Sequence, residues 1–370
     1  MTQPRDTTVP EVTLAMLYRL LGVREHESGR ELIRRGRLVS PRLPQLLISA
    51  AQRENVPLGT GTSDELRRAR NKALQYGRLY DAVRTRVPAV RLVKGPSLAR
   101  WYPTDLLRPV GDLDLVVESE EQLWEAARTL YDGVPVDRID LALQRHDGRT
   151  HVTVGLHWPS EDELLDRPYN IELTTLPLPG DAERTVPPRA TLPGDQTLAD
   201  VLSLAEERFQ RAFNVKDAVD VLMLFGQSPP DPVELAENAR CHRLAPELLE
   251  LVTYARTGTG AAFLDDFLTP LARPAAAELS CRKASADEPP VALGTGTVDG
   301  RLRAGIPVPG LQLTLHQREV GSLGAHRHDS DGVTLLCTPV GDFLLVCEEV
   351  VSRDSYDTAL SVLDRLEADR

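Results

Sequence analysis

Two carboxylates one residue apart, Asp112 and Asp114, open an apolar run of the chain. On a β-strand, side chains two residues apart point to the same face, so both carboxylates would project together while Leu113 and Leu115 face a core. Two close like charges repel each other unless a cation lies between them or their pKa values rise. Magnesium fits best, because it prefers oxygen ligands and often bridges carboxylates to substrate phosphates. The pair predicts phosphoryl or nucleotidyl transfer, and the alternative is a solvated turn or the cap of a helix that begins at Ser119.

A third carboxylate, Glu172, lies in a strand-like segment between Ile171 and Leu173. An unpaired charge within an apolar strand would be costly, and a site for two metal ions needs more than two carboxylates. We therefore expect Glu172 to join Asp112 and Asp114 in binding two Mg²⁺ ions, with Mn²⁺ as the alternative metal. The competing interpretation is a strand glutamate that faces solvent.

Cationic and glycine-containing segments that could bind a triphosphate precede the aspartates. Lys94 and Gly95 follow a predicted strand and precede a short predicted helix that includes Ser97. Glycine lets a phosphate approach the backbone, and free N–H groups at the start of a helix attract anions. Arg108, four residues before Asp112, is predicted to contact phosphate oxygens or to hold the aspartates. The alternatives are an ordinary strand-to-helix turn and a surface salt bridge.

A second group of charged residues follows later in the chain: Arg208, Arg211, Lys216, Asp217 and Asp220. The two arginines lie three residues apart, on one face of a helix, and the two aspartates repeat this spacing on the next helix. We expect the cations to bind the triphosphate and one aspartate to orient or deprotonate an attacking hydroxyl. For Asp217 the sequence equally supports a capping box with Asn214.

The composition is that of a globular protein of two or three domains, with 370 residues, 41% of them hydrophobic and 26% charged. The net charge of −12 argues against broad binding to nucleic acid. The four cysteines form no Cys-x-x-Cys pair, and neither a membrane-spanning run nor a secretory signal is visible. We therefore expect a cytoplasmic protein, and the excess of Arg, Ala, Leu, Pro and Asp suggests a GC-rich bacterial source.

The pattern of apolar positions predicts an α+β protein with five parts. They are a helical N-terminal region at 1–88, an α/β core at 89–180, a helical domain at 195–271, a linker at 272–296 and a β-rich C-terminal domain at 297–370. In the last part, His326 and His328 alternate along the chain with His316 nearby. The further ligand spacing of a metal site is not evident there, so an appendage that binds a partner or substrate is favoured.

The segment from Val93 to Val117 resembles the signature of a family of poorly characterised bacterial nucleotidyltransferases in the DNA polymerase beta-like superfamily. That signature is Lys-Gly, a short helix, Tyr-Pro, and then Arg-Pro-x-x-Asp-hydrophobic-Asp, and each element is present. The segment from Arg211 to Asp220 is similar to a helical motif of abortive-infection and toxin nucleotidyltransferases. The resemblance implies a small mixed β-sheet core flanked by helices, with magnesium bound by the aspartate pair and a third carboxylate.

The chain departs from the family at the third carboxylate. Members often carry carboxylate-x-His-Trp on the third strand, whereas the pair His157-Trp158 has no carboxylate two residues before it. The predicted function is magnesium-dependent transfer of a nucleoside monophosphate from a nucleoside triphosphate such as ATP to an acceptor. A small molecule or a protein side chain is the favoured acceptor. The alternatives are a catalytically degenerate module that binds a nucleotide or peptide, and a toxin-like enzyme that modifies tRNA.

Overall fold

The computed structural model describes residues 11–24, 26–181, 185–286, 296–316, 324–348 and 350–368. The chain divides into two compact units, and each is made of three separate stretches. The first unit comprises Met1–Gln75, Val93–Gly111 and Leu178–Pro289, and the second comprises Tyr76–Leu92, Asp112–Pro177 and Pro290–Arg370. Across the described ranges, no helix is long and apolar enough to cross a membrane.

The first unit is built from helices. They are α1 (Leu14–Leu20), α2 (Gly29–Val39), α3 (Leu43–Arg53), the first part of α4 (Thr60–Arg86), α5 (Gly95–Ala99), α7 (Gln196–Glu206), the 3-10 turn η1 (Glu207–Phe209), α8 (Val215–Gln227), α9 (Pro232–Cys241), α10 (Ala245–Thr259), the 3-10 turn η2 (Ala262–Leu264) and α11 (Asp265–Ala286). Helix α8 is buried on nearly every side because it contributes to two cores. Val219 and Leu222 pack with α1 to α3, and Val221 and Leu224 pack with α7, α9, α10 and α11.

Residues 272–286, the first part of the predicted linker, are helical in the structure. They continue α11, although Pro270 and Pro274 lie inside this helix. Leu271 and Ala275 are buried in the core shared with α9 and α10. The burial of these side chains stabilises the helix by more than the prolines destabilise it. A prediction from composition takes account of the prolines but not of this burial. Residues 287–295 lie outside the described ranges.

The second unit carries a mixed sheet, except that Val93, the last residue of the first strand, is counted with the first unit. Its strands are β1 (Arg91–Val93), β2 (Leu113–Val116), β3 (Arg138–His146), β4 (Arg149–Trp158), β5 (Tyr169–Thr174), β6 (Val308–Leu315), β7 (His326–Ser330), β8 (Val333–Thr338) and β9 (Gly341–Leu345). Within the described residues the strand order is β1-β2-β5-β4-β3-β6-β9-β8-β7. Strands β2 and β5 run parallel, whereas β4 pairs with β3 and β5 in antiparallel fashion. The predicted α+β class with a mixed sheet is therefore confirmed.

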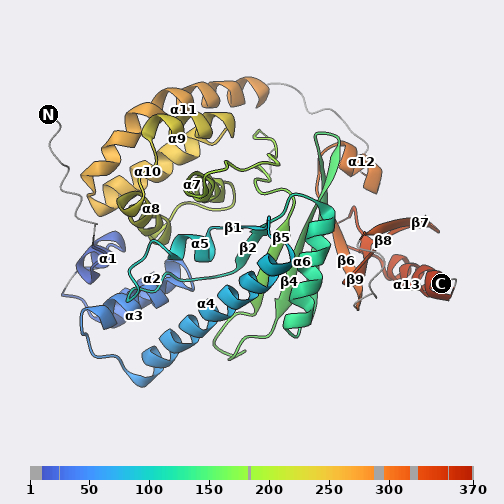
Figure 1. Ribbon diagram of the computed structural model, residues 1–370, viewed down its shortest axis with the longest axis horizontal. Coiled ribbons are helices and arrows are strands. Elements are labelled where there is room, and N and C mark those ends of the chain that lie inside the picture. The colour runs from blue at the N-terminus through green and yellow to red at the C-terminus, as the bar shows by residue number, and fades with distance from the viewer. Residues whose placement is uncertain are drawn as a thin grey trace. The chain divides into compact units, whose positions relative to one another are not determined.

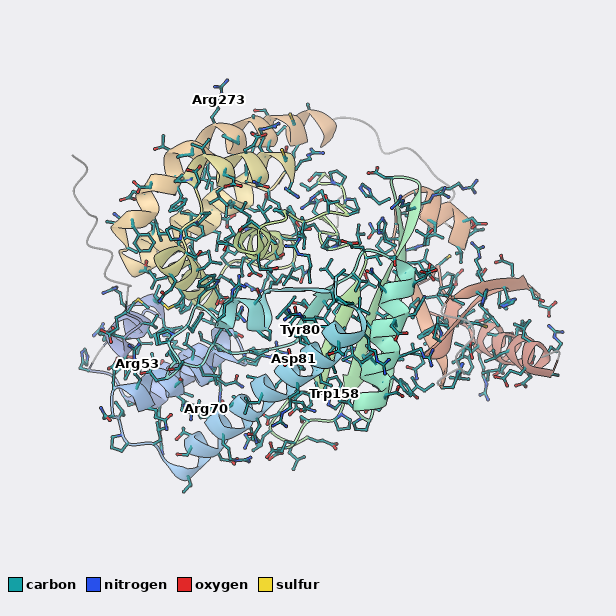
Figure 2. The ribbon with its side chains drawn as sticks, viewed as in Figure 1. Arg53, Arg70, Tyr80, Asp81, Trp158 and Arg273 are labelled. Atoms are coloured by element: carbon teal, nitrogen blue, oxygen red, sulfur yellow. The ribbon has the colours of Figure 1, made fainter. Side chains whose placement is uncertain are left out.

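One face of this sheet is apolar, and α6 (Glu120–Gly133) and the C-terminal part of α4 lie along it (Figure 1). Alternate residues of β4 and β5 are buried, as their period-two pattern requires: Val154, Leu156, Trp158, Tyr169, Ile171 and Leu173. The Trp158 ring, labelled in Figure 2, stacks on Tyr169 with ring centroids 5.1 Å apart. Tyr76 of α4 meets Trp158 edge-on at 6.3 Å. The side chains that alternate with these apolar residues project from the opposite face of the sheet, and most of them are polar.

The C-terminal strands extend the same sheet, because β6 pairs with β3 through Val308 and Gly310. Helices α12 (Val298–Arg303) and α13 (Arg353–Ala368) accompany them. Leu335 and Leu344 of the strands pack against Val362 of α13 in a small core of their own. The strands predicted in this part are present, and β7, which carries His326 and His328, is one that the sequence pattern did not indicate.

Candidate functional site

The aspartate pair lies at the start of β2 in the second unit. Leu113 and Leu115 are fully buried, while Asp112 and Asp114 are half-buried on the opposite face. The predicted alternation of this segment is therefore confirmed. The helix-cap alternative does not apply, because Ser119 itself caps α6 by accepting a hydrogen bond from the Gln122 N–H.

Glu172 lies beside the aspartates. Strands β2 and β5 are parallel, and Asp114 and Glu172 are register partners. Paired residues of neighbouring strands project from the same face, so Asp112, Asp114 and Glu172 share one face of the sheet. Glu172 is exposed, so the burial cost from which its metal role was predicted does not arise. The physical reason is that β5 is apolar on one face only.

Three further polar residues gather on this face around Gly155. Gly155 of β4 lies in register with Glu172 on one side and with Asp140 on the other. His157 Nε2 and Asp140 Oδ2 are hydrogen-bonded at 2.7 Å. A Cβ atom on Gly155 would lie 3.3 Å from His157 Nε2 and 3.5 Å from Asn170 Oδ1. Asp140 and Asn170 were not among the predicted site residues, although the alternation of polar and apolar residues along β3 and β5 contains the signal.

The three carboxylates are suitable ligands for a magnesium ion whose remaining ligands come from the phosphates of a substrate and from water. In the part of the chain that the structure describes, no three Asp, Glu, His or Cys side chains form a ready-made metal site. Magnesium is commonly held by one or two carboxylates, with phosphates and waters completing the octahedron. The hard oxygen donors of Asp112, Asp114 and Glu172 match this requirement. Among the described residues, His326 and His328 of β7 form no such group with other side chains either.

In the first unit, the turn from Lys94 to Ser97, hereafter the Lys94 turn, is tightly held. Lys94 has a φ of 54°, a value that residues with a side chain rarely adopt. Its N–H donates to Asp200 Oδ1 at 3.0 Å, and the Ser97 hydroxyl donates to Asp200 Oδ2 at 2.6 Å. Asp200 is fully buried, and burial raises its pKa to about 6. Asp200 was not among the predicted residues, and its signal in the sequence is a carboxylate within an otherwise apolar helix, α7.

Arg108 also stabilises the Lys94 turn by a hydrogen bond. It donates through Nη1 to the Gly95 carbonyl at 2.9 Å. Its Nε and Nη2 donate to both carboxylate oxygens of Asp220, at 2.7 and 2.8 Å. Tyr102 also donates to Asp220, at 2.6 Å. Arg108 and Asp220 are 2% and 0% exposed, so the predicted alternative of a salt bridge is present, but in the core instead of at the surface.

The pKa of Asp220 shows how strongly its partners favour the charged form. Burial alone would raise this pKa, but the charges of Arg108 and Lys216 and the hydrogen bonds of Arg108 and Tyr102 outweigh it. The result is a pKa of about 2. Asp220 is therefore ionised at any physiological pH.

Asp217 forms the capping box that the sequence supported as an alternative. It accepts from the Asn214 N–H at 2.8 Å, while Asn214 caps α8. Asp217 also receives two hydrogen bonds from Arg211, at 2.7 and 2.9 Å. Lys216 lies 3.3 Å from Asp220. The two aspartates are fully buried and their cations lie nearer the surface, with 36% of Arg211 and 21% of Lys216 exposed.

Glu207 links this group to the Lys94 turn. Its Oε1 lies 2.5 Å from Lys94 Nζ, and its Oε2 lies 3.4 Å from Arg211 Nη2. Burial acts to raise the pKa of Glu207, but the charges of Lys94 and Arg211 outweigh it and hold this pKa below its usual range. Lys94, Arg211 and Lys216 are thus brought together, and we call them the cation cluster. Glu207 was not among the predicted residues.

Arg208 is not part of the cation cluster. Its Nε donates to Glu250 of α10 at 2.8 and 2.9 Å, and both side chains are about half exposed. The spacing of three residues predicted that Arg208 and Arg211 share one face of a helix. The 3-10 turn η1 interrupts that helix, so the two side chains have different partners. The phosphate-binding role predicted for Arg208 is untested, and its pair with Glu250 favours the opposite expectation, that Arg208 binds no phosphate.

Comparison with known proteins decides the family. Residues 37–259 match the model of a family described as uncharacterised nucleotidyltransferase, which is more than half of the chain. The chain belongs to this family. The predicted relationship is therefore confirmed, and nucleotidyl transfer with a nucleotide substrate is the general activity of this nucleotidyltransferase. The matched range includes both the carboxylate face and the cation cluster and ends before the C-terminal strands. No curated protein and no solved structure matches the chain.

Proposed function

We propose that this nucleotidyltransferase is magnesium-dependent and transfers a nucleoside monophosphate from a nucleoside triphosphate to a hydroxyl of a small molecule or a protein. The observation that carries the proposal is the common face of Asp112, Asp114 and Glu172, fixed by the register of β2 with β5. Three carboxylates on one face of the sheet supply the hard oxygen donors that magnesium prefers.

The carboxylates of the second unit are assigned to metal binding. Asp112, Asp114 and Glu172 would hold two Mg²⁺ ions, or Mn²⁺ in their place, together with phosphate oxygens. When bound, such ions activate an attacking oxygen and neutralise the departing pyrophosphate. The rigid sheet contributes orientation, because neighbouring strands fix the spacing of the side chains they carry.

The cation cluster of the first unit is assigned to the triphosphate. Lys94, Arg211 and Lys216 present partly exposed positive charges above buried carboxylates. Such charges attract polyphosphate anions, and the fork of an arginine binds phosphate oxygens in pairs. Asp217 and Asp220 are buried and bound by cations, so we propose that they hold Arg211, Lys216 and Arg108 in place and do not act on the acceptor hydroxyl.

The test is transfer of label. The protein is incubated with each α-labelled nucleoside triphosphate, Mg²⁺ and a cell extract, alongside Asp112→Ala/Asp114→Ala. Glu121→Gln is the matched control, since it removes an exposed negative charge from α6, away from the carboxylate face. We expect magnesium-dependent pyrophosphate release and label transfer with the wild type and the control only. If no nucleotide supports either reaction, the chain is a binding module and the proposed activity is wrong.

A further inference from the structure

The carboxylate of Glu207 binds two cations at once. One oxygen lies 2.5 Å from Lys94 Nζ and the other 3.4 Å from Arg211 Nη2. These are the groups to which the proposed function assigns the triphosphate. A phosphate group offers the same chemistry, with two anionic oxygens that can each accept from one cation. Glu207 and a phosphate therefore compete for the same donors.

We propose that Glu207 is a competing ligand of the triphosphate subsite, which a polyphosphate must displace from Lys94 and Arg211 in order to bind. This inference rests on the proposed function, because it takes from it the role of Lys94 and Arg211. Its consequence is selectivity. Either ligand must displace this carboxylate, but a triphosphate binds several cations of the cluster at once and so offsets more of that cost than a single phosphate does.

Glu207 is the carboxylate of this group that is best placed to move. Asp217 is fully buried and also accepts from the backbone of Asn214. Asp220 is fully buried and also accepts from Tyr102. Glu207 lies in the three-residue turn η1 at the end of α7, is 17% exposed, and is held by the cations of the subsite themselves. A glutamate also has one more rotatable bond than an aspartate.

The charge of Glu207 persists at neutral pH. Its pKa lies below the usual range, because the charges of Lys94 and Arg211 outweigh the effect of burial. Protonation therefore does not remove the competing carboxylate under physiological conditions. An anionic ligand, and not a change of pH, is what releases Lys94 and Arg211 from it.

The experiment compares the affinities of the full-length protein and its variants for inorganic tripolyphosphate and for inorganic phosphate by titration calorimetry. Glu207→Gln keeps the size of the side chain and removes its charge. We expect it to bind tripolyphosphate about tenfold more tightly than the wild type, since a charge-assisted contact no longer has to be broken. We expect a larger gain for inorganic phosphate. Glu250→Gln, which removes a partner of Arg208 outside the cluster, should leave both affinities unchanged.

Each result has a definite meaning. Adding Lys94→Gln to Glu207→Gln should abolish the gain, because the gain comes from releasing Lys94. Equal or weaker binding of tripolyphosphate by Glu207→Gln overturns the inference and leaves the proposed function standing. Absence of binding by the wild type and by every variant overturns the inference together with the assignment of the cation cluster to the triphosphate, whereas the label-transfer assay decides the proposed activity. If Glu207→Gln loses the circular dichroism of the folded protein, Glu207→Ala is measured in its place with the same expectations.

Discussion

Asp114 and Glu172 face the same side of the sheet because they are register partners in the parallel pair of β2 and β5. They lie 58 positions apart in the chain, and α6, β3 and β4 separate their strands in sequence. A shift of one residue in this register would turn Glu172 to the apolar face beneath α6. The buried Ile171 and Leu173 prevent such a shift, so the apolar core of the sheet fixes the spacing of the carboxylates.

Replacing Glu172 by glutamine should reduce nucleotidyl transfer by about 100-fold, since loss of a metal partner costs activity and metal affinity on that scale. Stability should change little, because the Glu172 side chain is exposed. The measurement is the rate of magnesium-dependent transfer together with the midpoint of urea unfolding. Glu121→Gln is again the control. A Glu172→Gln protein with the rate of the wild type would mean that this glutamate merely faces solvent.

The two arginines near η1 should respond differently to the same substitution. Arg211→Gln removes a member of the cation cluster and should weaken tripolyphosphate binding about tenfold. Arg208→Gln breaks only an exposed pair with Glu250 and should leave the affinity unchanged. Titration calorimetry on both variants measures this, with circular dichroism to confirm folding. Equal losses in the two variants would show that the net charge, and not the cluster, attracts the anion.

Arg108 and Asp220 should behave as a buried ion pair. Arg108→Leu leaves the buried Asp220 charge with only Lys216 and Tyr102 as its named partners and should lower the free energy of unfolding by about 3–5 kcal/mol. Arg108→Leu/Asp220→Leu should cost less than the sum of the two single variants, because neither charge remains. Urea unfolding of the four proteins measures this coupling. Additive losses would mean that the two side chains act independently.

The same pair should give the stability an acid-dependent component. Asp220 has a pKa of about 2 in the folded protein against an ordinary value of 3.8, so the folded state binds this proton less tightly than the unfolded chain. The contribution of the pair is therefore complete above about pH 4 and is lost as the pH falls from about 4 to about 2. The wild type should lose stability over this range more steeply than Arg108→Leu/Asp220→Leu. Parallel profiles of unfolding free energy against pH would contradict this.

The features that could be predicted from the sequence are those that depend on residues close together in the chain, namely strands, the faces of their side chains, and helix caps. The alternation around Asp114 gave its strand and its face, and the spacing after Asn214 gave the capping box of Asp217. The sequence could not predict the partners of Arg108, because Asp220 lies 112 residues away and only the packing of α8 brings the two together. For the same reason Glu207 went unnoticed. Its contact with Lys94 spans 113 residues, and a glutamate at the end of a helix is ordinary in sequence.

The position of Gly155 leads to a test of whether Glu172 replaces a carboxylate that related proteins place elsewhere. Members of the family that the chain resembles often carry a carboxylate two residues before His-Trp, and here Gly155 stands two residues before His157. Gly155 is the register partner of Glu172, so a carboxylate at either position would project from the same face of the sheet. We therefore expect Gly155→Asp to restore part of the activity that Glu172→Gln loses.

The double variant Gly155→Asp/Glu172→Gln should transfer label about tenfold faster than Glu172→Gln alone, since it regains a metal-binding carboxylate in a different position. A Cβ at Gly155 meets His157 Nε2 at 3.3 Å and Asn170 Oδ1 at 3.5 Å, and both are ends of side chains that can shift by the small distance needed. Gly155→Asn/Glu172→Gln is the matched control, because asparagine has the shape of aspartate without its charge. Equal rates for the aspartate and asparagine variants would show that the position of the carboxylate on β4 cannot serve the metal, and that Glu172 has no equivalent on that strand.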